Sequence, residues 1–205
     1  MMKAMSAALC VCAAGIAAKA DIRITEWAYQ ANGGEFIELT NTGAAPIDMT
    51  GWSFDDDSRL PGVLDLSSFG VVAPGESVII TEAGAADFRA AWGLAASVKV
   101  VGSNTTNLGR NDEINIYNGV ALVDRLTFGD QNILGTIRTQ LISGITTPAN
   151  WGTNNVSAWF FAAAGDQYGS YVSALGDVGS PGVVPAPGVA VVMGLGVLVM
   201  GRRRR

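Results

Sequence analysis

The sequence predicts an all-β fold, a sandwich of two sheets with one short helix. Short runs of alternating apolar and polar residues recur along the chain, as expected of half-buried strands. Turn-forming Gly, Asn and Pro residues separate these runs. The pair Asn118-Gly119 lies between two of them and is the strongest hairpin signal, because the favoured two-residue turn needs positive φ at both positions. Residues 21–182 provide enough chain for one such domain.

The first strands are expected at residues 21–29 and 35–40. In the first, Ile22 and Ile24 alternate with polar residues, and the second is rich in Phe, Ile, Leu and Thr. A second apolar run is spaced for burial against it and consists of Ile47, Met49, Trp52 and Phe54.

The remaining strands are expected at residues 60–69, 77–81, 97–101, 113–117 and 121–128, with short ones at 139–142 and 157–161. The helix is expected at residues 83–93, where alanine is frequent. Phe88 and Trp92 are four residues apart and so share one face of the helix, and Gly93 is placed to end it.

Residues 1–20 have the pattern of a secretory signal peptide. Lys3 supplies the positive charge, residues 7–18 form the apolar run, and Ala18 and Ala20 fit the cleavage pattern. The alternative is a buried N-terminal helix. Both cysteines, at positions 10 and 12, lie inside this segment, so the mature chain is expected to contain no disulfide.

Residues 183–205 have the pattern of a C-terminal membrane-spanning helix. A proline-containing motif precedes an apolar segment that is marginally long enough to cross a bilayer. Four arginines follow the segment and are expected to stay on the cytoplasmic side. The motif consists of Val184, Pro185, Ala186, Pro187 and Gly188, and the arginine cluster of Arg202, Arg203, Arg204 and Arg205.

This tripartite tail resembles the PEP-CTERM sorting signal of Gram-negative bacteria. The resemblance implies processing by an exosortase-type enzyme and transfer to the cell surface or extracellular matrix. Ala186 stands where that family usually has glutamate, which is a departure from its motif. The alternative is a plain tail anchor that keeps the protein in the inner membrane.

The charge distribution argues against nucleic-acid binding. All 18 acidic residues lie between Asp21 and Asp177, whereas Lys3, Lys19 and the four terminal arginines lie outside that region. The exported part is therefore strongly acidic and offers no electrostatic footprint for phosphate backbones.

Several short motifs resemble the lamin-tail domain, an immunoglobulin-like β-sandwich found in nuclear lamins and in many exported bacterial proteins. The resemblance is specific over residues 21–129 and implies an immunoglobulin-like sandwich with a structural or binding role. The matching residues are Ile24-Thr25-Glu26, Glu35-Phe36-Ile37-Glu38-Leu39-Thr40-Asn41, Ile47-Asp48, Gly51-Trp52, Pro74-Gly75-Glu76, Asp112-Glu113-Ile114 and Tyr117-Asn118-Gly119.

The composition excludes most common catalytic chemistry. The chain has no histidine and its mature form is expected to have no cysteine, so triads, dyads and zinc sites with nitrogen or sulfur ligands are excluded. Carboxylate pairs, as in glycoside hydrolysis, are the remaining possibility. The candidates are Glu26, Glu35, Glu38, Asp112 and Glu113, which we expect on solvated strand edges.

Asp55 and Asp57 form the one candidate metal site, for calcium. Calcium prefers several carboxylate and carbonyl oxygens from one loop, and two of the three consecutive aspartates at this strand end would share a face. The competing interpretation is a solvated, turn-forming loop. No other cofactor is expected.

The five tryptophans divide between the core and the surface. At least three are expected to fill the core, Trp52 among them, because each buries a large apolar area. Trp151 is the candidate for an exposed contact.

The sequence therefore predicts an exported, non-enzymatic binding or structural module. The expected partners are signal peptidase, an exosortase-like enzyme, the membrane through the C-terminal helix, and extracellular polysaccharide or surface proteins. Two alternatives stay open: a calcium-dependent, lectin-like binder and a carboxylate-based extracellular hydrolase.

Overall fold

The computed structural model describes residues 22–183, which form short strands, one α-helix and three 3-10 turns. The strands, in chain order, are β1 (Ile22–Ala28), β2 (Phe36–Asn41), β3 (Ile47–Asp48), β4 (Trp52–Asp55), β5 (Leu64–Asp65), β6 (Val71–Val72), β7 (Ser77–Thr81), β8 (Lys99–Val101), β9 (Asn111–Asn118), β10 (Ala121–Gly129), β11 (Gly144–Ile145), β12 (Phe160–Phe161), β13 (Tyr171–Val172) and β14 (Val178–Gly179). Helix α1 spans Ala85–Trp92, and the 3-10 turns span Ser67–Phe69, Pro148–Asn150 and Val156–Ala158.

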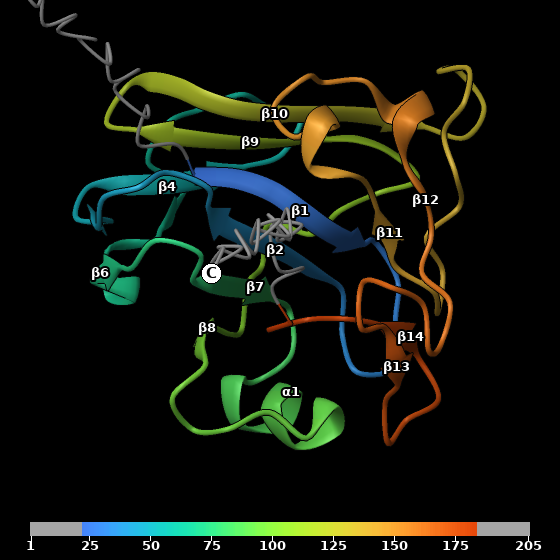
Figure 1. Ribbon diagram of the computed structural model, residues 1–205. Coiled ribbons are helices and arrows are strands. Elements are labelled where there is room, and N and C mark those ends of the chain that lie inside the picture. The colour runs from blue at the N-terminus through green and yellow to red at the C-terminus, as the bar shows by residue number, and fades with distance from the viewer. Residues whose placement is uncertain (1–21, 184–205) are drawn as a thin grey trace, which may run out of the picture.

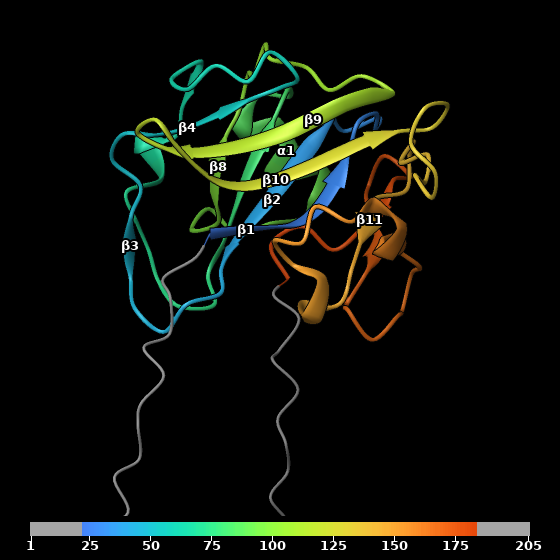
Figure 2. The same ribbon diagram turned by 90° about the horizontal axis from the view of Figure 1, so that it is seen from above.

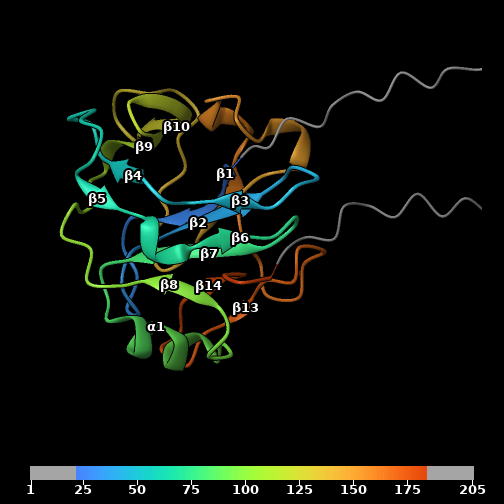
Figure 3. The same ribbon diagram turned by 90° about the vertical axis from the view of Figure 1, so that its left-hand side faces the viewer.

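The strands build two main sheets that pack face to face. The six-stranded sheet has the order β12-β11-β1-β2-β7-β8, and the four-stranded sheet has the order β10-β9-β4-β5. In Figure 3 the four-stranded sheet, the six-stranded sheet and α1 form three successive layers. Two small pairs, β3 with β6 and β13 with β14, complete the fold, and the second lies beside β11 and β12 in Figure 1. The predicted all-β sandwich with one helix is confirmed.

The larger apolar core lies between the two sheets. Strands β1, β2 and β7 point alternate side chains into it, so residues such as Ile24, Leu39 and Val78 meet Phe54 and Ile116 from the facing sheet. The ring centroids of Trp27 and Phe128 are 4.1 Å apart. This core holds the sandwich together without any disulfide among the described residues.

A smaller core lies on the outer face of the six-stranded sheet, where α1 covers it. Phe36 and Ile79 point outward from β2 and β7 and contact Phe88 and Trp92 of the helix. Gly93 ends the helix in the left-handed conformation, with φ 64°, as its glycine type predicts. The predicted helix and its apolar face are therefore confirmed.

The predicted β9–β10 hairpin is confirmed, but its turn is shifted by one residue. Asn118 pairs with Ala121, so the two-residue loop is Gly119-Val120, and of these two residues and Asn118 only Gly119 has positive φ. The strand predicted at residues 139–142 is wrong. Leu141 has φ 63°, which interrupts an extended run, and only isolated bridges form at Gln140 and Ile142. The strand predicted at residues 157–161 is shortened to β12, because a 3-10 turn occupies Val156–Ala158.

The two ends of the described chain lie on the same side of the molecule. Ile22 begins β1 and Val183 follows β14, and both are on this side in Figures 2 and 3. We call this side the proximal end. Strand β1 runs away from it, so the β1–β2 loop lies at the opposite, distal end. Residues 22–183 contain no helix of the length and apolarity that a bilayer crossing requires.

Candidate functional site

The predicted export signals cannot be placed in the structure. The cleavage residues Ala18 and Ala20, the motif Val184 to Gly188 and the cluster Arg202 to Arg205 all lie outside residues 22–183. The signal helix and the C-terminal helix therefore stay predictions. Among the described residues, two distal cavities and one buried carboxylate pair bring polar side chains together as candidate sites.

The first cavity, which we call the distal groove, lies where β4 and β10 end and β9 begins. The antiparallel register brings Gly129, at the end of β10, opposite Asn111, at the start of β9. The loop after β4 adds Asp57 and Arg59, and the groove has a volume of about 300 Å³. Its other lining residues are Asp112, Glu113, Thr127, Phe128, Asn132 and Ile133.

Glu113 forms the centre of an ionic network beside this groove. Arg59 donates to both of its carboxylate oxygens, at 2.7 and 2.6 Å, and Thr127 donates to Oε1 at 3.0 Å. Arg125 lies 3.5 Å from Oε2, and Asn115 donates to the same oxygen. The bidentate bond from Arg59, with these further contacts, lowers the pKa of Glu113 to about 2 despite its burial.

The two calcium candidates do not point to a common centre. Asp55 is buried, and its Oδ2 accepts hydrogen bonds from Ser58 Oγ at 2.7 Å and Leu60 N at 2.5 Å, so it closes the turn after β4. Asp57 is exposed and lines the distal groove. Among residues 22–183, no group of three or more carboxylate, histidine or cysteine side chains is placed to hold a metal.

Asp112 also contributes to this loop cluster rather than to a catalytic pair. Its Oδ2 accepts from Gly109 N at 2.6 Å, and its Oδ1 accepts from the N–H groups of Glu113 and Asp57. Burial, together with the charges of Asp57 and Asp56, raises the pKa of the Asp112 carboxyl.

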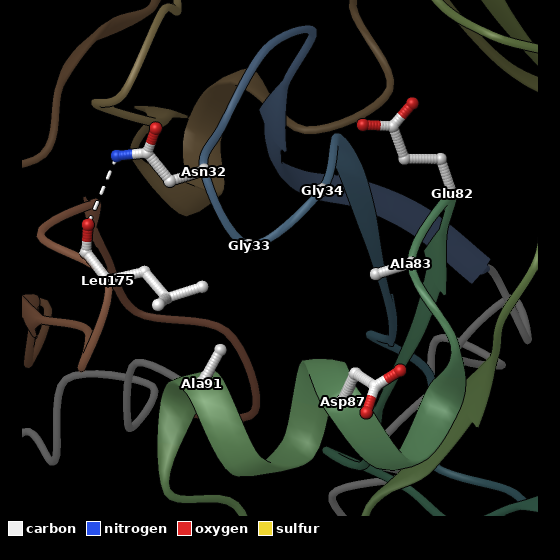
Figure 4. A pocket seen from close by; sticks show the side chains of 8 residues that line it. All are labelled: Asn32, Gly33, Gly34, Glu82, Ala83, Asp87, Ala91 and Leu175. Atoms are coloured by element: carbon white, nitrogen blue, oxygen red, sulfur yellow. Dashed lines mark hydrogen bonds between the residues drawn. The ribbon is translucent and has the colours of Figure 1, made fainter.

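The second cavity lies between the β1–β2 loop and α1 and has a volume of about 350 Å³. Figure 4 shows the Asn32 amide directed at the carbonyl of Leu175, with Glu82 and Asp87 on the opposite wall. Asp177 fixes the β1–β2 loop, because its carboxylate accepts hydrogen bonds from the N–H groups of Asn32 and Gly33, each at 2.9 Å.

Glu35 lies at the distal end of β2 and is buried, with 3 % of its surface exposed. Its Oε2 accepts the N–H of Leu108 at 2.8 Å, and its own N–H donates to Glu82. Burial, opposed by that hydrogen bond and reinforced by Glu82 and Asp112, raises the pKa of Glu35 to about 8.

The third place is a pair of buried carboxylates, Glu26 and Glu38. They are directly opposite each other on β1 and β2, and each is 1 % exposed. The expectation that Glu26, Glu35, Glu38 and Glu113 lie on solvated strand edges is therefore wrong. β1 and β2 are central strands of their sheet, and distant segments cover their outer face.

Every oxygen of this pair accepts a hydrogen bond from a donor within the fold. Glu26 Oε1 accepts from Ser143 Oγ and, at 2.7 Å, from Ser180 N, while its Oε2 accepts from Ser180 Oγ at 2.8 Å. Glu38 Oε1 accepts from Thr25 Oγ1 at 2.9 Å, and its Oε2 accepts from Gly182 N at 2.6 Å.

Burial raises the pKa of both carboxyls, to about 6 for Glu26 and about 8 for Glu38, and the charge of Glu26 contributes to the shift of Glu38. At neutral pH the pair therefore holds about one proton between its two side chains. Sequence reasoning missed Ser143, Ser180 and Gly182, because no local pattern connects them to β1 and β2.

Four of the five tryptophans are buried, which confirms the expectation of at least three. They are Trp27, Trp52, Trp92 and Trp159. Trp151 is half-buried rather than exposed, and its Nε1 is buried without a hydrogen-bond partner among the described residues.

Comparison with known families agrees with the fold. The model of the Lamin Tail Domain matches residues 16–130, which include β1 to β10 and α1. The segment that carries Ser143, Ser180 and Gly182 follows the matched region. No significant match was found among the curated proteins or among the solved structures.

Proposed function

Because the chain belongs to the Lamin Tail Domain family, we propose that it is an exported, non-enzymatic binding or structural module. In this proposal signal peptidase removes residues 1–20, and an exosortase-like enzyme processes the tail near Ala186. The mature domain is then presented at the cell surface or in the extracellular matrix. The apolar segments at both ends of the sequence, each flanked by basic residues, support the export step.

The observation that carries the binding role is the position of the distal groove. The described ends of the chain lie on the proximal side, and the groove is formed by loops at the far ends of β4, β9 and β10. A domain tethered through its C-terminus would turn this groove away from the membrane. Its Asn, Asp, Arg and Thr side chains offer the donors and acceptors that sugar hydroxyls require.

The carboxylates support a structural role over hydrolysis. Glu26 and Glu38 are covered and hydrogen-bonded within the fold, and Glu113 is held by Arg59 and Arg125. A glycosidase needs two carboxyl groups that flank an accessible bond. These contacts favour a stabilising role for the candidate carboxylates over a catalytic one.

A calcium-dependent, lectin-like binder is the second candidate, since Asp57 lines the groove. Calcium would then raise the melting temperature of the wild-type protein but not that of an Asp57→Asn variant. Equal responses in the two proteins would remove this candidate.

Two measurements test the main proposal. The intact mass of the protein from each fraction of its native host shows whether both ends are processed. A species in the inner membrane that retains Arg202 to Arg205 would contradict sorting to the surface.

Cosedimentation with the host's extracellular polysaccharide tests the binding role of the distal groove. We expect Asn132→Ala to weaken binding, with Val120→Ala at the β9–β10 hairpin as the control; equal binding would contradict the groove.

A further inference from the structure

The last described segment, residues 178–183, crosses the outer face of β1 and β2, and we call it the C-terminal strap. It begins with β14, whose Val178 accepts the N–H of Ser143 at 2.9 Å. Its path is closely fitted. A Cβ atom at Gly179 would lie 2.6 Å from Glu26 Oε1 and 3.2 Å from Trp92, so only glycine fits at that position.

Pairing with β13 and backbone hydrogen bonds to Leu141 and Ser143 hold the β14 part of the strap. The part that follows β14 is held by the two buried glutamates. Glu26 accepts the N–H and the hydroxyl of Ser180, and Glu38 accepts the N–H of Gly182. These contacts join residues at least 144 positions apart in the sequence. The carboxylate oxygens are therefore the acceptors that hold Ser180 and Gly182, in the part of the strap after β14.

The pair has no cationic partner in the described part of the chain. No ion pair involves Glu26 or Glu38 there. The titratable groups that face them are Tyr171 on β13 and Asp166 in the preceding loop, both of which are neutral or negative. Two ionised carboxylates at directly opposed positions would repel each other strongly in this setting.

A proton fits this site better than a metal ion. A cation would lie against the N–H groups of Ser180 and Gly182, which present their positive ends to the same oxygens. A proton on one of the two carboxyl groups leaves the hydrogen bonds from Ser180 and Gly182 in place and removes the repulsion.

We propose that Glu26 and Glu38 form a proton-dependent latch that holds residues 180–183 of the C-terminal strap against the sandwich and releases them when the pair loses its last proton. Residues 184–205 continue directly from the strap, so release would make the chain ahead of the predicted sorting motif accessible to a protease. That consequence rests on the proposed function, whereas the latch does not.

Amide hydrogen exchange of the full chain tests the latch, with rates corrected for the intrinsic effect of pH. Between about pH 5 and about pH 9 we expect the protection of the Ser180 and Gly182 amides to fall by tenfold or more, roughly the effect of 1.4 kcal/mol. The amides of β2 and β7 should keep their protection. Equal protection of the strap at both pH values, or parallel loss throughout the sheet, would overturn the proposal.

Two variants sharpen the test. The side chain introduced by Glu38→Gln cannot ionise, so the loss of strap protection between about pH 7 and about pH 9 should disappear. Ionisation of Glu26, whose pKa is about 6, still acts below that range. Glu35→Gln removes another buried carboxyl of raised pKa that has no contact with the strap, and the pH dependence should persist. If Glu38→Gln fails to fold, the wild-type comparison alone decides.

Addition of calcium separates a proton from a metal ion at this site. Restoration of strap protection at high pH by added calcium would indicate a bound metal and overturn the latch. Because these readouts are independent of processing and location, their failure is distinguishable from failure of the proposed function.

Discussion

Replacing Glu113 with glutamine should destabilise the domain in a pH-dependent manner. Glu113 is 4 % exposed and accepts hydrogen bonds from Arg59, Asn115 and Thr127. Lowering its pKa from 4.5 to about 2 corresponds to about 3 kcal/mol of preferential stabilisation of the ionised side chain in the folded state. Glutamine keeps the shape of the side chain but loses this charge.

The sign follows from the direction of the shift. Because the folded-state pKa is lowered, the stabilisation is fully present above the unfolded value of 4.5 and is lost as pH falls towards 2. The difference in unfolding free energy between wild type and Glu113→Gln should therefore be at most about 3 kcal/mol at pH 7, because the Arg59 side chain is 56 % exposed and solvent screens its pair with Glu113. It should decline to less than half of its pH 7 value near pH 3.

Urea unfolding of the full chain, followed by tryptophan fluorescence at a series of pH values, measures this difference. Asp87→Asn is the control, because Asp87 is exposed in the first turn of α1 and its loss should cost less than about 1 kcal/mol. A difference for Glu113→Gln that is independent of pH, or smaller than about 1 kcal/mol at pH 7, would refute the assigned role of the network.

Three further outcomes are expected from the same unfolding assay. Phe54→Ala, at a fully buried position between the sheets, should lower the unfolding free energy by about 3–5 kcal/mol, whereas Val120→Ala, 88 % exposed, should change it by less than about 0.5 kcal/mol. Gly34→Ala should be more damaging than Gly62→Ala: both glycines have φ above 90°, but only at Gly34 does an added Cβ meet a neighbour, at 2.8 Å. Wild-type stability should fall as pH rises from about 4.5 to about 8, because the raised pKa values of Glu26, Glu35 and Glu38 favour proton binding by the folded state, and Glu38→Gln should weaken this trend.

The sequence predicted those parts of the fold that have local signals. The alternation in β1, the glycine of the β9–β10 hairpin and the Phe88–Trp92 spacing each depend on residues within a few positions of one another. The region after β10 lacks such signals. There Leu141 adopts a left-handed conformation and β14 consists of two residues, so the path of the chain is set by long-range contacts.

The candidate site was predicted less well for the same reason. The sequence offered Asp57 as a calcium ligand and Glu113 as a member of a carboxylate pair, whereas their position beside the distal groove depends on where β4 and β10 end and β9 begins in space. The partner of Glu26 is Ser180, 154 positions away, and no periodicity within either segment indicates that contact. Burial of a glutamate on a central strand could be inferred only once its covering segment was known.

Glu38 and Glu113 show how one residue type obtains opposite properties from its surroundings. Both are buried on strands, yet Glu113 faces the guanidinium groups of Arg59 and Arg125, which favour its charge. Glu38 faces a second carboxylate and receives only neutral donors, which compensate burial incompletely. The first arrangement holds the loops of the distal groove at any pH well above 4.5. The second holds the C-terminal strap only while a proton is bound, so the two ends of the same domain are stabilised over different ranges of pH.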